Sequence, residues 1–250
     1  MKNIQKILGF NVCTLKQDDI ITSLNKDIKK GQQNIIYNIN PLIITNFYKN
    51  KDVVEEFNTQ KYNIPDGIGI VIASKLKGLN IKERIAGIDF FDGLMKLSND
   101  NGYKVYFYGA KEGIVDKAKE QLEKKYKKLK VVGTTNGYVS EEQALKEILS
   151  KKVDILLIGL GSPKQEEFII KHKKELKDIK VIMPVGGSFD VISGELKRAP
   201  DIFIKLNLEW LYRMIKEPKR IKQNLNLVKF VFLVLLKNKY YNKRRESGGE

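Results

Sequence analysis

Residues 153–200 read VDILLIGLGSPKQEEFIIKHKKELKDIKVIMPVGGSFDVISGELKRAP. Their first six residues form an apolar run that breaks at a Gly-Leu-Gly sequence and passes into a helical pattern over residues 164–167. Ser162 stands where a helix N-cap is expected, and Pro163 stands at the first helical position. This order predicts a buried parallel strand that feeds directly into a helix.

A second apolar run, residues 181–185, ends at Gly186-Gly187-Ser188-Phe189-Asp190 before another helical segment. The carboxyl ends of two neighbouring strands would then carry glycine and free N–H groups at one edge of a sheet, where α/β proteins bind ligands. Helix N-termini at that edge favour anions such as a nucleotide diphosphate. One such turn needs no ligand to explain it, but two neighbouring turns that also carry Gln165, Ser188 and Asp190 favour a binding site.

The composition is that of a globular protein with one sizeable core. The chain has 250 residues, of which 42% are hydrophobic and 30% are charged. Cys13 is the only cysteine and His172 the only histidine, which excludes an internal disulfide and a four-ligand Cys/His zinc site. No long apolar segment follows the basic N-terminus, so we expect no signal peptide and a reduced cytoplasmic location.

Positive charge is concentrated near the C-terminus. The net charge is +16, and residues 197–245 contain fourteen Lys and Arg against three Asp and Glu. This distribution indicates that the C-terminal region meets an acidic partner or surface. We therefore expect two units, a main domain over residues 1–199 and a basic helical appendage over residues 200–250.

Strand and helix patterns alternate along the main domain. After a short apolar stretch at residues 7–15, strands are expected at residues 35–39, 103–108, 131–133, 153–158 and 181–185, with helical patterns between them. Asp66, after Pro65, can cap one of these helices. Strands separated by helices of this length predict an α/β fold, a Rossmann-like parallel sheet covered by helices on both faces.

The apolar helical segment at residues 225–236 can be explained in two ways. A membrane-spanning helix needs about 20 apolar residues, and Asn226 and Lys229 interrupt this shorter segment. Flanking basic residues favour a helix that lies on an anionic membrane surface. Alternatively, residues 230–236 pack on the main sheet or on another subunit, so a homo-oligomer stays open.

Two other functions are disfavoured by the motifs. Gly109 and Gly113 resemble half of a dinucleotide fingerprint, but the third glycine is missing, and residues 134–136 (Thr-Thr-Asn) lack the expected ribose-binding acid. A nucleic-acid-binding protein would suit the charge, yet Trp210 and Phe230 fall on apolar helical faces and not on a stacking surface. We therefore expect neither a dehydrogenase nor a nucleic-acid partner.

Eight short motifs together resemble the WecG/TagA/CpsF family of glycosyltransferases over residues 5–225, and within it the TagA-like N-acetylmannosaminyltransferases of wall teichoic acid synthesis. The motifs are Asn40-Pro41, Pro65-Asp66-Gly67, Arg84-Ile85-Ala86-Gly87, Gly137-Tyr138, Gly161-Ser162-Pro163-Lys164-Gln165-Glu166, Gly186-Gly187-Ser188-Phe189-Asp190, Lys197-Arg198-Ala199-Pro200 and Glu209-Trp210-Leu211-Tyr212-Arg213.

The resemblance implies an inverting enzyme that needs no metal or other cofactor. Its donor would be UDP-N-acetylmannosamine, its acceptor undecaprenyl-diphosphate-linked N-acetylglucosamine, and its product a β-1,4 linkage. It would act peripherally on the inner face of the cell membrane. Other UDP-sugars, namely N-acetylmannosaminuronic acid, glucose and galactose, serve as donors in the wider family, and no residue here discriminates between them.

The resemblance also implies roles for particular residues. Asp66 would be the general base, and Asn38 occupies the second catalytic position, where a threonine is expected. The donor site would contain Asn40, Arg84, Gly137, Tyr138, Gly161, Gln165, Gly187 and Asp190. Arg213 and Arg220 would hold the acceptor diphosphate, and Gln223 replaces an expected third basic residue. The sequence contains no Asp-x-Asp pair for a divalent ion, which agrees with metal-free transfer.

Overall fold

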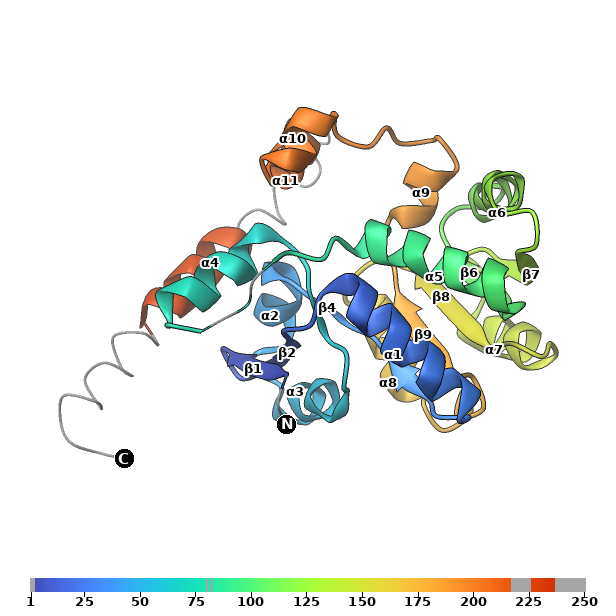
Figure 1. Cartoon of the computed structure of the whole chain (residues 1–250), viewed down its shortest axis with the longest axis horizontal. Coiled ribbons are helices and arrows are strands. Elements are labelled where there is room, and N and C mark those ends of the chain that lie inside the picture. The colour runs from blue at the N-terminus through green and yellow to red at the C-terminus, as the bar shows by residue number, and fades with distance from the viewer. Residues whose placement is uncertain (1–2, 80, 82, 217–225, 237–250) are drawn as a thin grey trace.

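A five-stranded parallel sheet forms the centre of the protein. The computed structural model describes residues 3–79, 81, 83–216 and 226–236. The strand order is β3 (Asn34–Ile35), β9 (Val181–Pro184), β8 (Ile155–Gly159), β6 (Lys104–Gly109) and β7 (Lys130–Thr135), and each neighbouring pair is parallel. The expected α/β architecture is therefore confirmed (Figure 1).

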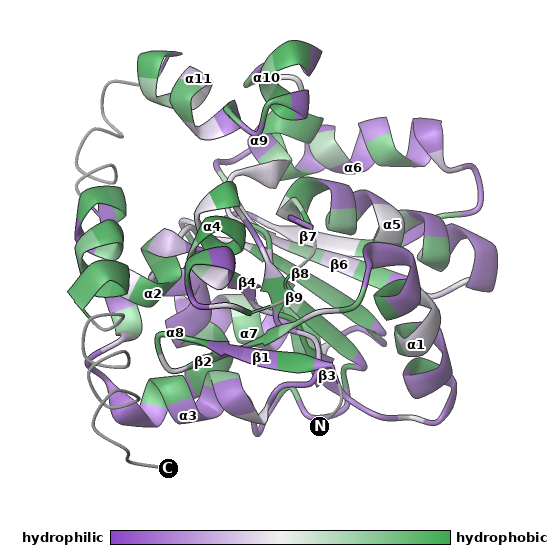
Figure 2. Ribbon diagram, turned by 60° about the vertical axis from the view of Figure 1, so that its left-hand side comes forward, coloured by the Kyte–Doolittle hydropathy of each residue, from purple (hydrophilic) through white to green (hydrophobic). Residues whose placement is uncertain are grey.

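Alternation along the strands divides the apolar side chains between two cores. Phe107 and Leu157 point into one core and Tyr106 and Leu156 into the other, because successive strand residues face opposite sides. The strands β8 and β9 are buried along their whole length and hydrophobic throughout (Figure 2). The central sheet therefore needs helices on both faces, as the sequence predicts.

Amphipathic helices cover both faces of the central sheet. One core contains residues of α1 (Gln17–Lys29), α5 (Gly87–Asn101), α6 (Ile114–Lys125) and α9 (Ser188–Ile192). The other contains residues of α2 (Pro41–Phe47), α3 (Lys51–Thr59), α4 (Ile68–Leu76), α7 (Glu141–Leu149) and α8 (Lys164–Lys171).

Two small sheets depart from the expected pattern. The apolar stretch at residues 7–15 contributes to an antiparallel hairpin of β1 (Ile4–Ile7) and β2 (Phe10–Cys13), which reverses through residues with positive φ, Leu8 and Gly9. The expected strand at residues 35–39 splits, because its second half, β4 (Asn38–Ile39), leaves the central sheet to pair with β5 (Ile64–Pro65). This departure brings Asn38 beside the chain segment that precedes Asp66.

The two helix caps expected from the sequence are not found, although other helices are capped. The Ser140 hydroxyl accepts a hydrogen bond from the Gln143 N–H and caps α7. The expected Asp66 cap is wrong, since Gly67, with a φ of 89°, takes the N-cap position of α4 without a side-chain cap. Ser162 is also not the N-cap of α8, because Pro163 occupies that position and the Ser162 hydroxyl accepts from Asn46 Nδ2.

The described residues after Pro200 are mostly helical. They form α10 (Asp201–Lys205), α11 (Glu209–Lys216) and a helix at residues 226–236, and no helix of the described residues is long and apolar enough to cross a membrane. Phe230 and Val234 of the last helix are buried in the same core as α2 and α4. Its outward face remains apolar and exposed (Figure 2), at Val228, Phe232 and Leu236.

Candidate active site

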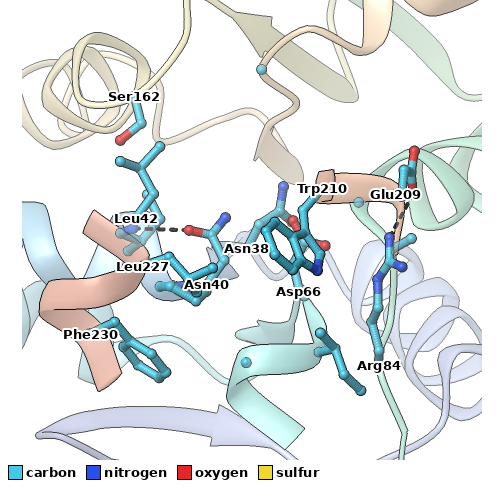
Figure 3. A pocket seen from close by; sticks show the side chains of 18 of the residues that line it. Asn38, Asn40, Leu42, Asp66, Arg84, Ser162, Glu209, Trp210, Leu227 and Phe230 are labelled. Atoms are coloured by element: carbon cyan, nitrogen blue, oxygen red, sulfur yellow. Dashed lines mark hydrogen bonds and ion pairs between the residues drawn. The ribbon is translucent and has the colours of Figure 1, made fainter. Parts of the chain in front are cut away.

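A cavity of about 590 Å³ opens beside the carboxyl ends of β4, β5, β8 and β9. Six of the predicted site residues line it, namely Asn38, Asn40, Asp66, Arg84, Gln165 and Gly187. They come from segments that are far apart in the sequence and that the sheet brings to one edge. The structure therefore gathers most of the predicted donor and catalytic residues in one place (Figure 3).

The other four predicted residues lie outside the lining of this cavity, farther along the same edge. Gly137 follows β7, and its N–H donates to the Ala110 carbonyl. Tyr138 is 76% exposed. Gly161 and Asp190 follow β8 and β9. The edge includes the topological switch point between β6 and β8, whose connections lead to β7 and β9 on opposite sides, and ligands of open α/β sheets bind at such points.

Asp66 is positioned by the short β4–β5 sheet. Its backbone N–H donates to the Ile39 carbonyl at 2.9 Å, and its half-buried side chain belongs to the cavity wall. Asn38 lies beside it on β4, where its Nδ2 donates to the Pro184 carbonyl at 2.9 Å. The Asn38 Oδ1 is buried and has no hydrogen-bond partner among the described residues. The Asn38 amide oxygen is thus available to a polar group of a ligand next to the Asp66 carboxyl.

Asn40 caps a helix in addition to its predicted role in donor binding. Its Oδ1 accepts from the Ile43 N–H at 2.9 Å and caps α2. An N-cap of this kind stabilises a helix by about 1 kcal/mol. Because the oxygen is used in the cap, the Asn40 amide nitrogen is the atom available to donate to a ligand.

Arg84 is engaged by the C-terminal part of the chain. Its Nη2 donates to Glu209 Oε2 on α11 at 2.8 Å, and both side chains are largely buried. Its Nε is buried and without a partner among the described residues. Arg198 extends this cluster through an ion pair with Asp89 at 2.7 Å and a longer one, 3.8 Å, with Glu209. The guanidinium of Arg84 therefore faces the cavity while it ties α11 to the main domain (Figure 3).

Two arginines are expected at the acceptor diphosphate, and the structure describes the backbone of one of them. Arg213 belongs to α11, but its side chain lies outside the described part of the chain, as do Arg220 and Gln223. Their role remains a prediction.

Glu166 is a lining residue that the sequence did not single out. It is 1% exposed and lines the cavity next to Gln165 on α8. Burial raises the pKa of its carboxyl to about 7, although hydrogen bonds from Gln165 and Ser162 oppose that rise. Burial therefore favours the protonated form of this carboxyl far more than that of an exposed Glu.

The C-terminal helices form an apolar wall that sequence reasoning also missed. Trp210 and Met214 reach the cavity from α11, and Leu227, Phe230 and Val231 reach it from the last helix. They face Ile68, Ile72 and Leu76 of α4. The available signal was the apolar periodicity of residues 225–236, which shows that one face is buried but not what it faces.

The site therefore has a polar end with a carboxylate, amides and a guanidinium, and an apolar end between α4 and the last helix. The fold and this site are those of a Rossmann-like α/β protein with a cavity that is polar at one end and apolar at the other. The family model for the glycosyl transferase WecG/TagA/CpsF family matches residues 5–245. The chain belongs to this family of glycosyltransferases.

Curated relatives agree with this assignment. A Bacillus subtilis (strain 168) protein named N-acetylglucosaminyldiphosphoundecaprenol N-acetyl-beta-D-mannosaminyltransferase is 35% identical over 206 residues, which cover 82% of this chain and 80% of the relative. A Staphylococcus aureus (strain MW2) protein of the same name is 34% identical over 201 residues, covering 80% and 78% of the two chains. The resemblance seen in the motifs is thereby confirmed.

Proposed function

We propose that this glycosyltransferase moves N-acetylmannosamine from UDP-N-acetylmannosamine to undecaprenyl-diphosphate-linked N-acetylglucosamine, forming a β-1,4 linkage with inversion. The names of the relatives support this acceptor and this sugar. The main support from the structure is one cavity in which Asp66 and its polar neighbours meet the apolar wall of the C-terminal helices. Such a cavity suits a substrate that joins a sugar diphosphate to a hydrocarbon chain.

Asp66 is the proposed general base. It would take the proton from the acceptor sugar hydroxyl as that oxygen bonds to the anomeric carbon of the donor, while the bond from this carbon to UDP breaks. Attack on the face opposite the leaving group inverts the anomeric centre. General base catalysis of this kind contributes about 10²–10⁴-fold to the rate. Asn38 would hydrogen-bond the donor sugar or the leaving group through its unpartnered oxygen.

UDP carries negative charge as it departs. The proposed mechanism uses no metal, so protein groups must stabilise this charge. The Arg84 guanidinium and peptide N–H groups of the turns at Gly161 and Gly187 are the proposed partners. Asn40, Gln165 and Asp190 would contact the donor from the same edge. Gly137 and Tyr138, near the switch point, would meet its nucleotide end, where the exposed Tyr138 ring offers a surface for a base.

The acceptor is proposed to approach along the apolar wall. Its isoprenoid chain would lie between α4 and the last helix, and Arg213 and Arg220 would hold its diphosphate. The outward apolar residues of the last helix and the basic C-terminal charge suit contact with an anionic membrane on its cytoplasmic face. In this proposal residues 1–199 are the catalytic domain and residues 200–250 the membrane and acceptor appendage. Pairing of two copies through the outward face is the competing arrangement.

A donor screen tests this function directly. The enzyme is incubated in EDTA with a short-chain lipid-diphosphate-N-acetylglucosamine and each UDP-sugar in turn, and released UDP is measured. We expect release with UDP-N-acetylmannosamine only when the acceptor is present. Preference for another UDP-sugar would replace the donor, and turnover that disappears in EDTA and returns with manganese would contradict the metal-free mechanism.

A further inference from the structure

Glu166 is a buried carboxyl in the cavity wall that the proposed mechanism does not use. Its Oε1 accepts a hydrogen bond from Gln165 Nε2 at 2.7 Å. Its Oε2 is buried and has no partner among the described residues. Gln165 and the Ser162 hydroxyl stabilise the ionised carboxylate in part, but burial of that charge has the larger effect.

Gln165 connects this carboxyl to the turn after β9. The Gly186 N–H donates to Gln165 Oε1 at 3.0 Å, and both residues line the cavity. A peptide N–H can only donate, so it requires the amide oxygen of Gln165 on its side. The amide nitrogen must then point to Glu166, which has to accept. The three residues form a chain that joins α8 to the Gly186–Gly187 turn.

Burial favours the neutral form of Glu166 more strongly than its hydrogen-bond donors favour the charged form. Burial is the largest influence on its pKa, which lies at about 7, and Glu167, the next residue on α8, raises it further. Tyr37, from the connection between β3 and β4, is neutral, because burial raises the pKa of its phenol well above 10, with further contributions from Glu56 and Glu166. Glu56 of α3 is itself paired with Lys173 at 2.6 Å. Asp66 and Arg84 face the same cavity from other elements.

We propose that Glu166 is a positioning residue that acts as an uncharged acid, holding the Gln165 amide and the Gly186–Gly187 turn in place while keeping negative charge away from the donor diphosphate. The identity of that donor rests on the proposed function. Ionisation of Glu166 would add a like charge to the cavity and weaken donor binding. Neutral Glu166 is thus the form that binds donor.

The test compares the wild-type enzyme with Glu166→Gln, Glu166→Leu and the control Glu167→Gln, which removes an exposed carboxylate one residue away. KM for the UDP-sugar and kcat are measured from pH 6 to pH 9, where the sugar-linked diphosphate does not titrate. The wild type and the control should show a donor KM that rises about tenfold with pH, equivalent to about one pKa unit of coupling. Glu166→Gln should show a flat donor KM, and Glu166→Leu a high KM at every pH, because leucine cannot accept from Gln165.

A second measurement does not depend on transfer. The folded-state pKa of Glu166 lies above that of an ordinary Glu, so its contribution to stability is complete below about pH 4, is lost as pH rises to about 7, and does not change further above that pH. The Tm of the wild type should therefore fall relative to that of Glu166→Gln over this window. If no protein form uses any UDP-sugar, the proposed function fails, whereas the Tm comparison still tests the proton on Glu166.

Two results would overturn the inference. One is a wild-type donor KM whose pH dependence is unchanged in Glu166→Gln. The other is a Tm profile that is identical in the two proteins. Should Glu166→Gln fail to fold, a ¹³C NMR titration of the wild-type Glu166 carboxyl decides, since titration near the ordinary value of about 4.3 contradicts a neutral acid.

Discussion

Asp66 lies at the end of β5, where the backbone fixes its position in the cavity wall. Its N–H is fixed by the Ile39 carbonyl, and Gly67 supplies the cap of the next helix. We expect Asp66→Asn to lower kcat by about 10²–10⁴-fold, because an amide cannot take the acceptor proton. UDP-sugar binding, measured by calorimetry, should be retained. Unchanged turnover would exclude Asp66 as the base.

Single residues also show the limits of sequence reasoning. Glu166 and Glu167 are adjacent acids at the start of one helix, and the pattern gives no reason to separate them. The structure separates them, because Glu166 is buried in the cavity wall and Glu167 is exposed. Asp66 could be predicted because Pro-Asp-Gly is a recognisable motif, whereas the role of Glu166 depends on packing against Gln165 and the distant Tyr37.

The element α11 is attached to the main domain through Glu209. Replacing Glu209 by Gln should weaken the contact with Arg84 by about 1.5–3 kcal/mol, since the bond involves charged and largely buried groups. We expect amide hydrogen exchange in α11 to accelerate by about tenfold or more. The KM for the lipid-linked acceptor should rise with it.

A matched control for this change is Asp92→Asn. Asp92 pairs with Lys125 at 2.6 Å, but both side chains are exposed. Exposed pairs contribute about 1 kcal/mol at most, so exchange in α11 should stay as in the wild type. Equal effects of the two substitutions on α11 would contradict the anchoring role of Glu209.

The helix at residues 226–236 has two apolar faces with different expected tasks. Phe230 is 2% exposed and packs in the core, whereas Phe232 is 61% exposed. Phe230→Ala should lower the free energy of unfolding by about 3 kcal/mol through the cavity that it leaves. Phe232→Ala should change it by less than about 0.5 kcal/mol, while binding to anionic vesicles weakens by about tenfold.

Denaturation curves and vesicle flotation measure these two effects separately. If Phe232→Ala binds vesicles as the wild type does but changes the sedimentation behaviour of the protein, the outward face is an interface between copies. At this scale the sequence predicted an apolar helix over residues 225–236. The two-sided use of the helix could not be predicted, because every face of residues 230–236 is apolar.

Strand boundaries were less predictable than the strands themselves. Residues 35–39 look like one apolar strand, but the chain passes from the central sheet at Ile36 to a second pairing at Asn38. Nothing local in five consecutive residues encodes that change, which depends on β5 arriving from residues 64–65. The same change places Asn38 in the site.

At the scale of the molecule, the division at residue 200 can be tested by truncation. Residues 1–199 contain the whole central sheet and most of both cores, so we expect a folded protein with native circular dichroism and a lowered Tm. Loss of α11 and the last helix should abolish vesicle binding and use of the lipid-linked acceptor. Transfer at the full rate would show that the C-terminal segment has no part in acceptor binding.

The sheet, its two helical layers and the polar end of the site could be predicted from the sequence because they arise from local periodicity and compact motifs. The apolar end could not, since it forms between α4 and a helix more than a hundred residues later. Arg84 and Glu209 illustrate the same point, as each lies in a recognisable motif but only the folded chain brings them to 2.8 Å.

A cavity lined by residues from Asn38 to Leu235 also constrains when the enzyme can first become active. Domains fold as the ribosome releases them, from the N-terminus onward. A nascent chain can complete its sheet early, yet it lacks one wall of the pocket until the last helix has emerged. Synthesis that stops before residue 226 would therefore leave a folded but inactive protein, so that sugar transfer begins only after residues 226–236 have been translated.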